Sequence, residues 1–113
     1  MATANKVTIN IPVADAVESV KLLSALFDCD VVIEDGAKYA LVNLGGVRVA
    51  FVSGQEDIVG GRAALAVEVG DPVAVTNAAE SFGLPTRKAD HPSSRAFFVT
   101  RMPGAMDVVF YAK

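Results

Sequence analysis

The sequence predicts an α+β fold built from two tandem copies of a βαβββ module. One observation is an internal repeat: the stretch Thr8–Asp15 (TINIPVAD) has an echo in Ala64–Asp71 (ALAVEVGD), close to the midpoint of the 113 residues. Each copy alternates apolar residues with other residues at a period of two and stops at an aspartate. The second observation is that each copy is followed by the same order of elements, one segment of helical spacing and then three short segments of strand character.

In the first module, a strand is expected over Val7–Val13, with its odd-numbered residues on the core face. Asp15 is then expected to cap a helix, because its carboxylate can bind the free N–H groups of the first turn. The apolar stripe of this helix comprises Ala16, Val20, Leu23 and Phe27, widened by Leu22 and Leu26. Three strands in a meander should follow, with turns at Asp35-Gly36 and Gly45-Gly46: Asp30–Glu34, Lys38–Leu44 and Val47–Val52.

The second module repeats this order after a polar, glycine-rich connection. Its first strand is expected at Ala63–Val69, with Leu65, Val67 and Val69 on the core face. A helix should start at Asp71-Pro72, place Ala74, Ala78 and Phe82 on one face and stop at Gly83. The last three strands are expected at Thr86–Ala89, Arg95–Arg101 and Met106–Ala112. The predicted organisation is one domain over residues 1–113, with module one at about 6–53, a linker at about 54–61 and module two at about 62–113.

Composition narrows the classes of partner and the compartment. The formal net charge is −3 and the basic residues are scattered, which disfavours nucleic acid as a partner. No apolar run approaches the ~18 residues of a membrane span. Cys29 is the only cysteine, so the chain has no internal disulfide, which fits a reducing compartment. We therefore expect a cytoplasmic protein that binds neither nucleic acid nor membrane.

Three stretches resemble the vicinal oxygen chelate superfamily, which includes glyoxalase I, extradiol dioxygenases, fosfomycin resistance proteins and bleomycin resistance proteins. They are the strand ends Ile11–Asp15 (IPVAD) and Val67–Asp71 (VEVGD), and Phe98–Gly104 (FVTRMPG) before the last strand. The third is similar to the family's turn of Arg-Asp-Pro-Asp-Gly type, with Met102 and Gly104 where acids are usual. The resemblance covers nearly the whole chain. It implies a curved mixed-sheet cup with the helices outside and the ligand inside, and a homodimer.

The resemblance also implies where a divalent metal would be held, at the start of each module's first strand and the middle of its last strand. Those positions are occupied here by Thr8, Ala50, Ala64 and Val109. One hydroxyl and three apolar groups do not bind the divalent metals that require imidazole, carboxylate or thiolate ligands. We therefore expect no metal site and no cofactor.

Alternation along the strands predicts which side chains face into the cup. The candidate ligand-binding residues are Thr8, Asn10, Tyr39, Arg48, Glu68, Asp107 and Tyr111, among small apolar residues that include Ala50, Ala64 and Ala66. The charged members either orient a polar ligand or form an ion-pair network in a closed interior, and the sequence leaves both open. Phe97 and Phe98 point to opposite faces, one to the core and the other to the cup or an interface. His91, in a polar loop, is assigned no catalytic role.

Three functions are open at this point. The leading hypothesis is a metal-independent small-molecule binding protein of the glyoxalase/bleomycin-resistance type, which sequesters an antibiotic or a metabolite. The alternative is a lyase, isomerase or dioxygenase-like enzyme with a non-standard site, in which Glu68 or Asp107 acts as a base. The third is a structural or regulatory module with a filled cup, against which the small residues Ala50, Ala64 and Ala66 argue because they leave room.

Overall fold

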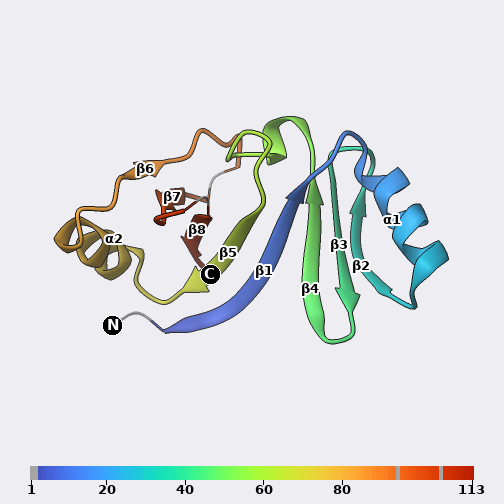
Figure 1. The fold of residues 1–113 in the computed structure, drawn as a ribbon, viewed down its shortest axis with the longest axis horizontal. Coiled ribbons are helices and arrows are strands. Elements are labelled where there is room, and N and C mark those ends of the chain that lie inside the picture. The colour runs from blue at the N-terminus through green and yellow to red at the C-terminus, as the bar shows by residue number, and fades with distance from the viewer. Residues whose placement is uncertain (1–2, 94, 105) are drawn as a thin grey trace. The chain divides into compact units, whose positions relative to one another are not determined.

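A computed structural model describes residues 3–93, 95–104 and 106–113. The chain folds into the predicted α+β order, βαβββ twice, with a short 3-10 turn between the two modules (Figure 1). The elements are β1 (Ala4–Pro12), α1 (Ala16–Leu26), β2 (Asp30–Asp35), β3 (Tyr39–Leu44), β4 (Val47–Val52), η1 (Gly54–Glu56), β5 (Ala64–Val69), α2 (Pro72–Ser81), β6 (Thr86–Lys88), β7 (Phe97–Arg101) and β8 (Asp107–Ala112). No helix among the described residues is long and apolar enough to cross a membrane.

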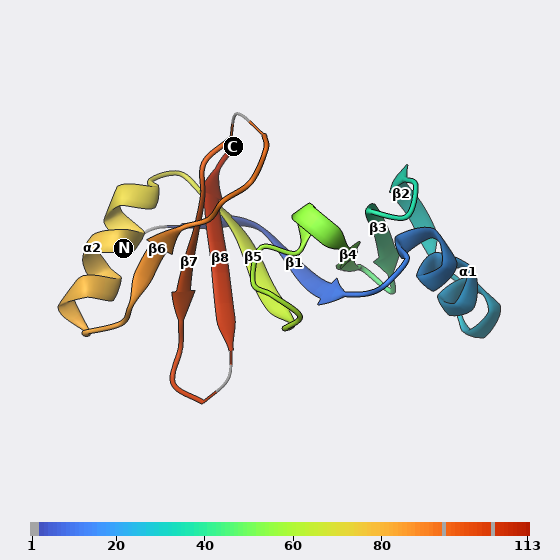
Figure 2. The same cartoon turned by 90° about the horizontal axis from the view of Figure 1, so that it is seen from above.

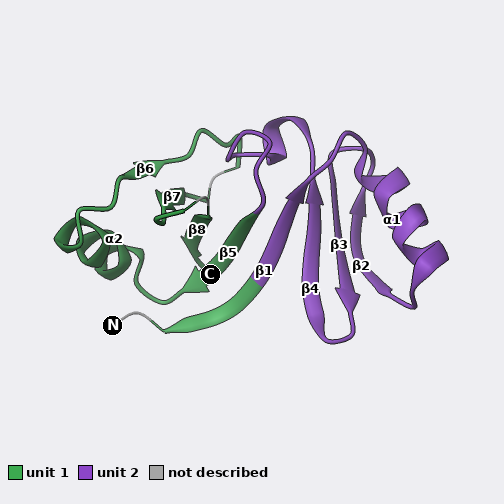
Figure 3. Cartoon of the chain, in the orientation of Figure 1, with its two compact units in different colours: residues 1–7, 64–113 green, residues 8–63 purple. Residues whose placement is uncertain are grey.

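The contacts within the chain divide it into two compact units (Figure 3). The N-terminal unit is residues 8–63, and the C-terminal unit is residues 64–113 together with residues 1–7. The first residues of β1 therefore belong to the C-terminal unit, and its remaining residues belong to the N-terminal unit.

The sheet of the N-terminal unit has the strand order β2-β3-β4-β1. Strands β2, β3 and β4 pair antiparallel as a meander, whereas β1 pairs parallel with β4, so that Asn10 lies beside Ala50. A parallel pair needs a crossover connection, and α1 begins that crossover on one face of the sheet. The sheet is therefore mixed, as expected.

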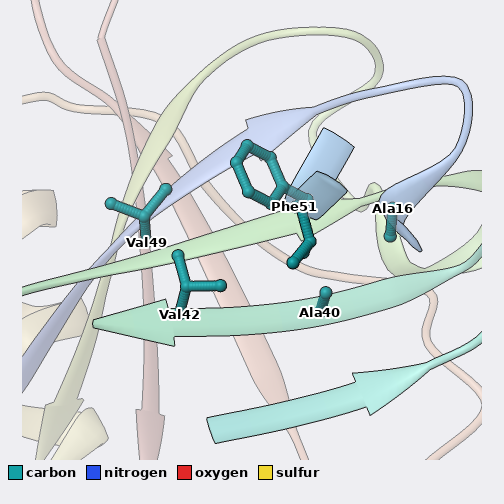
Figure 4. Close-up of a cluster of buried hydrophobic side chains, with 6 residues drawn as sticks. Ala16, Ala40, Val42, Val49 and Phe51 are labelled. Carbon is teal, nitrogen blue, oxygen red and sulfur yellow. The ribbon is translucent and has the colours of Figure 1, made fainter. Parts of the chain in front are cut away.

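The α1 helix covers one face of this sheet and forms its core. The Asp15 side chain accepts a hydrogen bond from the Glu18 backbone N–H at 3.0 Å, which confirms the predicted cap. Two buried helix residues pack with four buried strand residues, as Figure 4 shows for five of them. The cluster consists of Ala16, Val20, Ala40, Val42, Val49 and Phe51, with Ile11, Val13 and Leu23 packed against it.

Two predicted parts of this core are wrong. Val7 and Ile9 are 46% and 36% exposed, although they share the alternation of Ile11. The reason is the position of α1, which packs over β2, β3 and β4, so that Ile11 of β1 packs against the α1 cluster and Val7 and Ile9 do not. Phe27 is exposed as well, because α1 ends at Leu26 and the extended backbone of its C-cap takes Phe27 out of the helical stripe.

The C-terminal unit repeats the arrangement with the strand order β5-β8-β7-β6. Its β5 and β8 pair parallel, its other neighbours pair antiparallel, and α2 lies beside β6 (Figure 2). The Asp71 side chain caps α2 by accepting from the N–H groups of Val73 and Ala74, and Gly83 follows the helix end with a φ of 71°. The predicted stripe of α2 is wrong: Ala79 is its buried residue, and Phe82 is 82% exposed because it is already the C-cap residue.

Candidate functional site

In the N-terminal unit, the sheet face opposite the α1 cluster carries the predicted ligand-binding residues of that module. The strand registers pair Tyr39 with Val52 and Leu41 with Ala50 on this face. Leu41, Ala50 and Val52 form a second buried cluster, with Tyr39 packed against it. The alternation of the strands therefore separates a helix-covered face from a second apolar face, as the sequence predicts.

The polar side chains of this face differ in their bonding. The Arg48 Nε donates a hydrogen bond to the Thr8 Oγ1 at 3.3 Å, so two predicted residues are in direct contact. Asn43 is used by the local turn, because its Oδ1 accepts from the Gly46 N–H at 2.9 Å. The half-buried Asn10 side chain makes no hydrogen bond with the part of the chain that the structure describes. Its amide is thus the polar group of this face that can bind a ligand without losing an internal bond.

In the C-terminal unit, one sheet face carries Glu68, Tyr111 and Phe97 as direct cross-strand neighbours. Tyr111 of β8 lies beside Glu68 of β5 and opposite Phe97 of β7. We call these three residues the Glu68 row. The opposite face carries Thr100, whose Oγ1 donates to the Pro85 carbonyl at 2.9 Å in the segment that follows α2. The face of the Glu68 row also carries Ala64, Ala66, Val99, Asp107 and Val109.

Aromatic and cationic groups surround the Glu68 row. The ring centroids of Phe97 and Tyr111 are 5.3 Å apart, and the His91 ring meets Phe97 edge-on at 4.9 Å. The Arg95 guanidinium carbon lies 5.4 Å from the centre of the Tyr111 ring. Phe98 stacks instead on Phe110, on the other face of the sheet. His91, Arg95 and Phe97 were not among the predicted ligand-binding residues, and the alternation around Phe97 was the only sequence signal for them.

The two carboxylates of this face have different surroundings. Asp107 is buried, and its Oδ1 accepts from the Arg101 Nε at 3.1 Å. Glu68 is also buried, but its Oε2 is 3.9 Å from the Lys6 Nζ, beyond hydrogen-bond range. The ion-pair alternative that the sequence left open therefore describes Asp107 well and Glu68 poorly.

The residues at the four positions where the resemblance implies metal ligands do not fit a divalent metal. Thr8 is hydrogen-bonded to Arg48, and Ala50, Ala64 and Val109 offer no donor atom. Across residues 3–93, 95–104 and 106–113, no group of three or more His, Cys, Asp or Glu side chains converges on one point. The side chains present therefore do not match the donor set that a divalent metal needs.

A pocket of about 410 Å³ lies in the N-terminal unit, at the end of the sheet where Asn43 pairs with Arg48. The Cys29 Sγ beside it is 3.2 Å from the Ser24 Oγ. Its polar lining consists of Asp28, Cys29, Asp30, Asn43, Gly45 and Gly46.

Solved structures with the same fold cover almost the whole chain. The NAD-dependent benzaldehyde dehydrogenase from Legionella pneumophila has a TM-score of 0.78 at 13% identity, over 95% of this chain and 98% of that chain. A glyoxalase/bleomycin resistance protein/dioxygenase superfamily member from Vibrio splendidus 12B01 has a TM-score of 0.66 at 16% identity, over 96% and 98%. The methylmalonyl-CoA epimerase from Mycobacterium tuberculosis has a TM-score of 0.68 at 12% identity, over 96% and 88%.

No family model matches the sequence, and no curated protein matches it. Identities this low show the fold alone. The chain therefore has the vicinal oxygen chelate fold, which confirms the resemblance seen in the sequence, while its activity has to be argued from its own side chains.

The ion pair at Asp107 generates a stability prediction. Arg101→Gln should lower the free energy of unfolding by about 1–2 kcal/mol, because it removes a charged hydrogen bond from a buried carboxylate. Lys38→Gln is the matched control: its ion pair with Asp35 is exposed on both sides and should contribute at most about 0.5 kcal/mol. Urea denaturation of both variants measures the difference, and equal losses would contradict the role given to burial.

Proposed function

We propose that this chain is a metal-independent binding protein that sequesters a small, partly planar molecule such as an antibiotic or a metabolite. The observation that carries the proposal is the Glu68 row, in which two half-buried rings stand beside a buried carboxylate. The apolar residues Ala64 and Ala66 lie buried on the same face. Aromatic and apolar area with a few polar groups is the usual makeup of a small-molecule site.

Metal independence is supported by the chemistry of the side chains at the family's ligand positions. The Thr8 hydroxyl is engaged by Arg48, and the three remaining positions are apolar. Ligand recognition therefore has to rely on stacking, apolar contact and hydrogen bonds from this chain's own residues. A cytoplasmic location belongs to the same proposal, and the free thiol of Cys29 supports it.

An enzyme that uses Glu68 or Asp107 as a base is less well supported. A general base has to contact the proton that it abstracts. Asp107 is held by Arg101 and is almost fully buried, so it would have to lose that bond to reach a substrate. Glu68 remains the better candidate for such a role. Turnover that disappears in Glu68→Gln and persists in Asp107→Asn would support this alternative over simple binding.

One observation favours the filled module as a second candidate. Ala50, Ala64 and Ala66 are all buried, although the sequence suggested that they leave room. Leu41 and Val109, the larger neighbours of these alanines on the same faces, are also almost fully buried. Phe97 and Tyr111 are only half-buried, which leaves room for a ligand at the Glu68 row. Ligand binding therefore distinguishes the two candidates.

The test of the proposed function is binding in the presence and absence of a chelator. A panel of planar and apolar compounds is titrated into the purified chain by calorimetry, with and without EDTA. We expect at least one compound to bind one site per chain, with an affinity that EDTA changes by less than about twofold, since no metal contributes. Binding that EDTA abolishes would refute metal independence. If no compound of the panel binds, the filled module is favoured.

We also propose that the protein is a homodimer, as the fold resemblance implies. Support comes from large apolar side chains that are exposed on the edge strand β2 and at the end of α1, because such surfaces promote association. They are Leu26, Phe27, Val31, Val32 and Ile33.

Light scattering after size exclusion should give the mass of two 11.8 kDa chains. Val32→Lys should shift the protein toward the monomer, because it places a charge on the edge strand. Val73→Lys, at an exposed position on α2, is the matched control and should leave the mass unchanged. A wild-type monomer at high concentration would refute the dimer.

A further inference from the structure

Glu68 is a buried residue whose carboxylate makes no hydrogen bond with the described residues. Its side chain is 9% exposed, and the Lys6 Nζ lies 3.9 Å away. Within the described part of the chain, no donor comes within hydrogen-bond range of this carboxylate. A buried charge is costly unless hydrogen-bond donors replace the water that it loses. The Lys6 side chain is 44% exposed, so solvent screens this long ion pair and it does not fill that need.

The second buried acid of this sheet face, Asp107, allows a comparison. Asp107 is more deeply buried than Glu68 and accepts a direct hydrogen bond from Arg101. Burial of an acid on this face thus does not by itself leave it without a donor. Asp107 has a direct donor, whereas the described residues supply none to Glu68, so Glu68 is the acid of this face that can accept a hydrogen bond from a bound molecule.

The neighbours of Glu68 indicate the shape of the molecule that supplies this donor. Tyr111 and Phe97 follow Glu68 across the sheet in one row, and cross-strand neighbours are spaced by about 5 Å. A flat ring that rests on the two aromatic side chains can therefore place a substituent at its edge against the Glu68 carboxylate. Both rings are half-buried, which leaves part of each accessible.

We propose that the Glu68 row binds planar molecules that carry an N–H or O–H donor at one edge, such as aromatic amides, amidines and amino-heterocycles. This inference rests on the proposed binding function and specifies its ligand class. The rings of Phe97 and Tyr111 supply stacking, and Glu68 accepts the donor in a charge-assisted hydrogen bond. Arg95, over the Tyr111 ring, is a cation that would attract an anionic ligand instead. The choice between donor and anion is therefore the point to test.

The experiment compares simple probes by NMR titration of the full chain. Benzamidine and benzamide carry a ring and a donor, benzoate carries a ring and no donor, and acetamidine carries a donor and no ring. We expect benzamidine to bind more tightly than benzoate. Glu68→Gln should weaken benzamidine roughly tenfold, because a charged hydrogen bond is lost, and should leave benzoate unchanged or tighter. Glu80→Gln, on the exposed surface of α2, is the matched control and should change neither probe.

A second variant tests the aromatic part independently of Glu68. Phe97→Leu should weaken benzamidine and benzamide roughly threefold or more, through lost stacking, without changing acetamidine. Thermal melts establish that each variant is folded. If Glu68→Gln does not fold, the affinities of benzamidine and benzoate for the wild type and for Phe97→Leu still show whether the Glu68 row prefers a donor or an anion.

Benzoate binding as tightly as benzamidine would overturn the inference and identify Arg95 as the dominant group. A preference for benzamidine that survives Glu68→Gln would overturn it as well, because a residue other than Glu68 would then accept the donor. If no probe of this set binds but another compound of the calorimetric panel does, the inference fails and the binding function stands. If nothing in either set binds, both fail, and water or a local rearrangement satisfies Glu68.

Discussion

The structure depends on the parallel pairing of each module's first strand with its last, β1 with β4 and β5 with β8. A parallel pair requires a crossover, and in each module the crossover starts with a helix that follows the first strand directly. In the N-terminal unit the helix covers one sheet face, and strand alternation sends every second side chain to the opposite face. In the C-terminal unit the same alternation separates Thr100 and Phe98 from the Glu68 row. The faces that carry the candidate ligand-binding residues are thus a consequence of strand pairing.

Most of the fold was predictable because its signals are local. The aspartates that end the first strands, Asp15 and Asp71, cap the helices through their own side chains, and turn glycines mark the strand ends. Which side chains are covered was less predictable. Helical periodicity placed Phe27 and Phe82 in apolar stripes, but both are C-cap residues, where the backbone leaves the helix. Alternation placed Val7 on a core face, yet only packing decides which strands a helix covers.

The candidate site shows the same division between local and long-range information. Period-two reasoning placed Glu68, Asp107 and Tyr111 on one face, because alternation holds within each strand and the registers align them. The positions of His91 and Arg95 depend on a loop returning to the sheet, which has no periodic signal in the sequence. Alternation along the strands also predicted Glu68 and Asp107 equally as ligand-binding residues. Their difference arises from partners distant in sequence or on another strand, Lys6 for Glu68 and Arg101 for Asp107.

The face of the Glu68 row is the proposed ligand-binding surface of this chain. Amide chemical-shift mapping on the nitrogen-labelled protein, titrated with benzamidine, tests it most directly, because every strand reports separately. We expect the largest shifts to cluster at Glu68, Phe97 and Tyr111 and at their neighbours along β5, β7 and β8. Shifts centred on the pocket around Cys29, or on α2 and the face that carries Thr100, would contradict it.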